Sequence, residues 1–71
     1  MTNEQEQEQK VHPFYGHTAQ AYGLLPAALE NLKQLQEAFD DANEDFLAIE
    51  LKTMSARLEE IRQLLAEGPQ G

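Results

Sequence analysis

Residues 40–45, with the sequence DDANED, separate two series of regularly spaced apolar residues. Apolar residues spaced alternately three and four apart are typical of a helix with one buried face. The first series begins before this stretch and continues through it, and it contains Leu25, Ala28, Leu32, Leu35, Phe39, Ala42, Phe46 and Ile49. The second series contains Leu47, Leu51, Met54, Leu58, Ile61 and Leu65. Because the first series, if extended, would bury Glu60 and Gln63, the two series have different phases and indicate two helices.

The composition of the stretch favours the start of a new helix within it. Asp and Asn are good N-cap residues, and Asp41 with Glu44 has the spacing of a capping box. Against a turn, the stretch has no glycine or proline, and its acidic residues oppose the dipole of the preceding helix. The first interpretation is an all-α helical hairpin with helices at about 26–40 and 43–67. A single long helix in a coiled coil remains the alternative.

Pro26 sets the expected start of the first helix, because proline is tolerated at the first helical position. A helix over 26–40 is about 22 Å long, and one over 43–67 is about 38 Å long. The second helix would therefore extend beyond the first, and its last apolar residues would need a cover.

The segment HPFYGHTAQAYG, residues 12–23, is the nearest available cover. We expect it to form a short N-terminal helix or an ordered aromatic arm. Aromatic residues also dominate the energetics of protein interfaces, so its rings are candidate contacts for a protein partner. These candidates are Phe14, Tyr15 and Tyr22.

Composition narrows the class of protein. The formal net charge of −8 repels nucleic-acid phosphates and anionic lipids, so we expect no direct binding to nucleic acid or membrane. With no signal peptide and no apolar run of about 20 residues, we expect a cytoplasmic protein. Residues 1–11 are expected to be a disordered acidic and Gln-rich tail, 12–67 a single α-helical domain, and 68–71 a flexible tail.

No pattern in the chain indicates catalysis or cofactor binding. His12 and His17 are five residues apart and lack a third nitrogen or sulfur ligand, so we expect no metal site. The turn resembles the start of a calcium loop, but Phe46 and Lys52 stand where that loop requires Gly and Glu. We expect no enzymatic activity, no cofactor and no small-molecule substrate.

Protein–protein interaction is the function that these exclusions leave. The acidic residues at the expected turn are a second candidate contact for a partner: Asp40, Asp41, Glu44 and Asp45. Two helices alone rarely bury both apolar series, so we expect a homodimer or larger oligomer with a four-helix arrangement. The sequence therefore predicts a small acidic adaptor, co-chaperone or inhibitor that binds a protein, itself, or both. A coiled-coil oligomerisation element and an acidic mimic that inhibits a nucleic-acid-binding protein are the alternatives.

Overall fold

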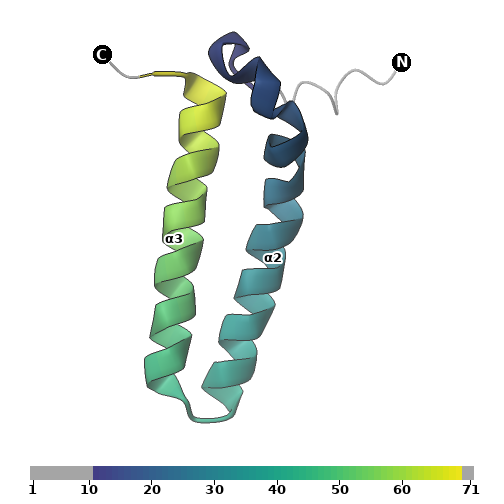
Figure 1. The fold of residues 1–71 in the computed structure, drawn as a ribbon. Helices are drawn as coiled ribbons and strands as arrows, with labels where there is room; N and C mark the ends of the chain where they lie inside the picture. Colours follow the sequence, from purple (N-terminus) through teal and green to yellow (C-terminus); the bar gives the residue numbers. More distant parts are fainter. Residues whose placement is uncertain (1–10, 70–71) are drawn as a thin grey trace.

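The computed structural model describes residues 11–69 and consists of three helical elements (Figure 1). A short 3₁₀ helix, η1 (Pro13–Thr18), leads into α2 (Ala19–Asp41), which is followed by α3 (Asp45–Glu67). Helices α2 and α3 lie side by side and antiparallel. The all-α hairpin is confirmed, and the single continuous helix is wrong. Residues 1–10 of the tail expected at 1–11, and residues 70–71 of the tail expected at 68–71, lie outside the described residues.

The turn between α2 and α3 is a Schellman motif formed without glycine. Asn43 adopts the left-handed conformation, with φ of 65°, and asparagine is among the non-glycine residues that best tolerate it. The backbone N–H of Glu44 donates to the carbonyl of Phe39 at 2.8 Å. The N–H of Asn43 donates to the carbonyl of Asp40 at 3.0 Å. These two hydrogen bonds satisfy carbonyls at the end of α2 and reverse the chain within three residues.

The start of α3 differs from the sequence prediction. The helix begins at Asp45, two residues later than expected, and Glu44 is its N-cap. The side chain of Glu44 makes no capping hydrogen bond, so the predicted capping box with Asp41 is wrong. The physical reason is that Asn43 and Glu44 take the C-terminal positions of the Schellman motif, so the new helix cannot include them.

The start of α2 also differs, because Pro26 lies inside the helix rather than at its first position. Its missing N–H removes one intrahelical hydrogen bond, but α2 begins seven residues earlier, at Ala19. Both long helices therefore have 23 residues. The sequence predicted a second helix longer than the first, with apolar residues at its end that another segment would have to cover. This prediction is wrong, because the two helices are equally long.

The core is a single seam between the two helices. Its buried apolar residues are Tyr22, Ala48 and Leu51, which are 5–7% exposed. The seam continues through half-buried positions spaced three and four apart on each helix. Its α2 members are Tyr22, Leu25, Leu29, Leu32, Gln36 and Phe39, and its α3 members are Ala48, Leu51, Ser55, Leu58, Arg62 and Leu65.

The structure divides the residues of the two predicted apolar series. Six of them lie in the interhelical seam: Leu25, Leu32, Phe39, Leu51, Leu58 and Leu65. Four of the others are 41–50% exposed: Leu35, Leu47, Met54 and Ile61. On α3 the reason is phase, because the small residues Ala48 and Ser55 occupy the positions nearest α2. The larger Leu47 and Met54, one residue earlier, point to one side of the hairpin.

Candidate interaction surfaces

One side of the hairpin is lined by large exposed apolar side chains. Leu47, Met54 and Ile61 each directly precede a seam residue of α3, and Leu35 does the same on α2. In an antiparallel pair of right-handed helices, the positions that precede seam residues lie on the same side of the pair. We call this side the apolar face. Its large members are Leu24, Leu35, Leu47, Met54, Ile61 and Leu64.

The apolar face is accessible along its whole length. Each of its six large side chains is between 40% and 64% exposed. Large exposed apolar patches occur at sites that bind proteins, membranes or ligands. The apolar face is therefore a candidate interaction surface.

The opposite side, which we call the polar face, is formed by the positions that follow seam residues. A shallow depression near the turn is lined from both helices by Gln36, Asp40, Asp45, Ala48, Ile49 and Lys52. Because these α2 and α3 residues meet in one depression, the following positions of the two helices share one side. Lys33, Glu37 and Gln63 are also on this side, so its surface is mostly charged or amidic.

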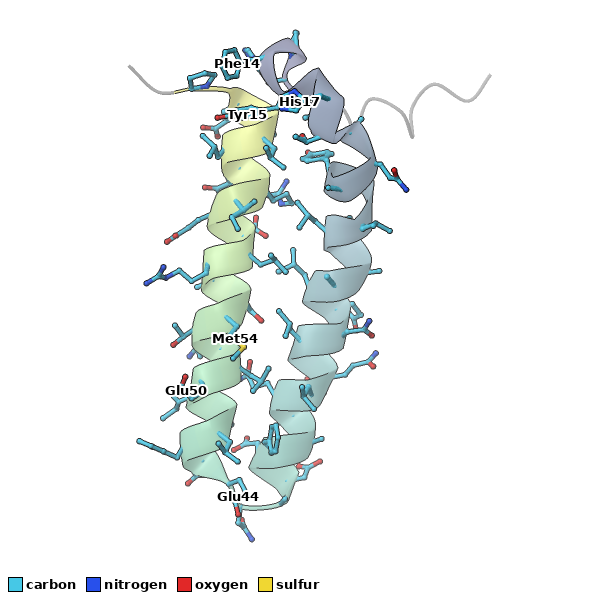
Figure 2. All side chains as sticks on the ribbon, viewed as in Figure 1. Phe14, Tyr15, His17, Glu44, Glu50 and Met54 are labelled. Carbon is cyan, nitrogen blue, oxygen red and sulfur yellow. The ribbon has the colours of Figure 1, made fainter. Side chains whose placement is uncertain are left out.

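Two charged residues interrupt the apolar face on α3, namely Glu50 and Arg57. Both are exposed, and within residues 11–69 neither has an ion-pair partner. Figure 2 shows Glu50 and Met54 on successive turns of α3. By contrast, Arg62 donates to Glu59 three residues earlier, through Nε at 3.0 Å and through Nη2. This hydrogen bond lowers the pKa of Glu59 and raises the pKa of Arg62.

The open end of the hairpin is closed by a contact that we call the clasp, between His12 and the C-terminal end of α3. The backbone N–H of His12 donates to the carbonyl of Leu65 at 2.8 Å, one of the carbonyls that lack a partner within the helix. The imidazole Nδ1 accepts from the N–H of Phe14 at 2.9 Å and so caps η1. A Cβ at Gly68 would lie only 2.6 Å from Cδ2 of His12, so the imidazole packs directly on this glycine.

The three aromatic candidates for partner binding have different environments. Phe14 is 62% exposed, and its ring meets the half-buried Tyr15 edge to face at 5.0 Å. Figure 2 shows both rings at the open end, near His17. Tyr22 is 5% exposed and is therefore corrected from a partner contact to a core residue. The reason is the early start of α2, which places Tyr22 in the interhelical seam, where its hydroxyl helps to raise the pKa of Arg62.

The acidic candidates lie at the turn, as the hairpin requires. Asp40, Asp41, Glu44 and Asp45 are all exposed there, and Glu44 is at the tip in Figure 2. No ion pair with Lys or Arg involves them in the described part of the chain. Within residues 11–69, no group of three or more His, Asp or Glu side chains is arranged to hold a metal ion. We call these four residues the acidic tip.

Comparisons of the chain with protein-family models, with curated proteins and with solved structures find no match. None of the helices in residues 11–69 has the length and apolar character needed to cross a bilayer.

Proposed function

We propose that this protein is a non-catalytic interaction module, a small acidic helical adaptor that binds protein through its apolar face. One observation carries the proposal. Three apolar side chains of the described chain are buried, whereas six large apolar side chains on one side are each at least 40% exposed. Complete burial of such a side chain contributes about 1.5–3 kcal/mol, so even partial burial of six favours association strongly.

The composition of the apolar face supports the same function. Its centre consists of aliphatic side chains and Met54, whose flexible thioether side chain adapts to irregular partner surfaces. Asn31, Glu50 and Arg57 supply polar groups among them. Apolar residues with a small number of polar groups at their edge are typical of specific protein interfaces. An adaptor, a co-chaperone and an inhibitor would all use such a surface.

Site-specific photocrosslinking in cells that naturally make the protein tests this proposal. A photoreactive amino acid replaces Met54 on the apolar face or, as the matched control, Ala56 on the polar face. Both positions are exposed and one helical turn or less apart on α3. We expect protein adducts, with this chain or another, from position 54 and few from position 56. Equal yields from both positions, or no adduct from position 54, would contradict the proposal.

A further inference from the structure

We infer that the occupant of the apolar face is a second copy of this chain, with the two α3 helices packed antiparallel about a two-fold axis between residues 53 and 54. This inference rests on the proposed function, because it names the partner of the same face. A two-fold interface must be complementary to itself, since both copies contribute the same surface. The order of residues along α3 meets this condition.

The first evidence is the placement of opposite charges. Glu50 and Arg57 lie equally far from the proposed axis, on opposite sides of it. The axis therefore places Glu50 opposite Arg57 of the second copy, and it also generates the reciprocal pair. Within one chain these residues are seven apart, or about 10 Å along the helix, too far for an ion pair. The second copy thus supplies the partner that each charge lacks in the described chain.

The second evidence is the placement of apolar side chains. The same axis places Phe46, which is 77% exposed, opposite Ile61 of the second copy, which is 47% exposed. Met54, 50% exposed, lies next to the axis and therefore meets its own copy. One register thus pairs Phe46 with Ile61 and Glu50 with Arg57, while Leu47 lies level with Glu60 of the second copy.

The third evidence is the distribution of charge around the face. The chain carries a formal net charge of −8, which opposes the association of two copies. Among positions that directly precede seam residues, Glu50 and Arg57 are the charged ones, so the face contributes no net charge. The antiparallel arrangement also separates the two acidic tips, with the two Asp45 residues about 25 Å apart along α3. That separation exceeds the screening length of about 8 Å at physiological ionic strength.

Charge exchange tests the register with the full chain in sedimentation equilibrium. Glu50→Arg places two arginines opposite each other at both pairs, and Arg57→Glu places two glutamates there. We expect each variant alone to dimerise at least about 10-fold more weakly than the unmodified chain, because like charges in contact are strongly unfavourable. An equimolar mixture of the two variants restores opposite charges at both pairs. We expect the mixture to dimerise about as strongly as the unmodified chain.

Matched controls separate the register from the effect of net charge. Glu37→Arg and Lys52→Glu make the same charge changes on the polar face, and we expect each to alter dimerisation by less than about threefold. General repulsion between acidic chains would make Glu50→Arg dimerise more strongly, whereas the register makes it dimerise more weakly. Helix content from circular dichroism should be unchanged, because all four positions are exposed.

The inference would be overturned by a monomeric unmodified chain throughout the micromolar range, by dimerisation of the two variants at the unmodified strength, or by a mixture that does not recover. These outcomes differ from a failure of the proposed function. A monomeric chain that still forms protein adducts from position 54 would retain the interaction module and exclude the second copy as its partner. Absence of adducts from position 54 would contradict the interaction module itself.

Discussion

The apolar and polar faces of the hairpin are formed by neighbouring positions of the same two helices. On α3, Met54 precedes the seam residue Ser55 and Ala56 follows it, so three consecutive residues belong to three different surfaces. The seam uses small residues such as Ala48 and Ser55, whereas the apolar face has the large Leu47 and Met54. The difference shows that large apolar side chains of α3 lie on an exposed face of the hairpin, whereas small ones form its contact with α2.

A charge at the centre of the apolar face should have the largest effect on association. Met54→Lys would place two lysines beside the two-fold axis, and we expect dimerisation to weaken at least about 100-fold. Ala56→Lys adds the same charge on the polar face and should change dimerisation by less than about threefold. Sedimentation equilibrium measures both. Equal losses in the two variants would remove the distinction between the faces.

Disruption of the clasp should have the next largest effect. It should lower the stability of the fold without changing the apolar or the polar face. Gly68 has φ of 90° and ψ of 180°, a conformation that is essentially restricted to glycine, and its added Cβ would meet His12. We expect Gly68→Ala to lower the free energy of unfolding by about 2 kcal/mol in urea titrations at a fixed protein concentration.

Gly23→Ala is the matched control for the clasp. Gly23 lies inside α2, and a Cβ added there would meet no atom within 4 Å, so we expect this variant to be about 0.5–1 kcal/mol more stable than the unmodified chain. If Gly68→Ala were as stable as the unmodified chain, the packing of His12 on Gly68 would contribute nothing to the fold.

Substitution of two exposed apolar residues near the turn allows a direct comparison of the two faces. Phe46 is 77% exposed beside the apolar face, and Ile49 is 58% exposed on the polar face. We expect Phe46→Ser to weaken dimerisation about 10-fold, through the loss of its contact with Ile61 of the second copy. Ile49→Ser should leave dimerisation unchanged. A larger effect of Ile49→Ser in sedimentation equilibrium would place the interface on the other side.

A substitution in the interhelical seam should have the smallest effect. The hydroxyl of Ser55 is buried and has no hydrogen-bond partner in the described chain. We expect Ser55→Ala to raise the free energy of unfolding by about 1 kcal/mol, since it removes an unsatisfied polar group. Gln63→Ala, at an exposed position of the polar face, measures the gain from helix propensity alone. A gain for Ser55→Ala no larger than this control would show that its hydroxyl is satisfied.

The hairpin could be predicted from the sequence because the change of phase at residues 40–45 is a local feature. Its details depend on contacts across the chain. The left-handed Asn43 makes the turn that lacked a glycine, and the burial of Tyr22 against α3 accompanies a helix that continues through Pro26. Periodicity could not reveal these contacts, because it reports only spacing within one segment.

The candidate site shows the same limit more strongly. Hydrophobicity favours the series Leu47, Met54 and Ile61 over the neighbouring Ala48, Ser55 and Arg62, yet the latter face α2. Sequence reasoning also missed Glu50 and Arg57. Their positions on either side of Met54 can be read from the sequence. Only the packing of the two helices shows that all three residues lie on the exposed side of α3.

A single spin label tests the two-fold pairing of the apolar faces most directly. The chain has no cysteine, so Gln63→Cys accepts one label on the polar face, away from the proposed interface. Any dipolar coupling between labels must then come from a second copy. We predict labels separated by about 28 Å along α3, with the coupling lost on dilution with unlabelled chain. Absence of intermolecular coupling at concentrations well above micromolar would contradict the two-fold pairing of the apolar faces.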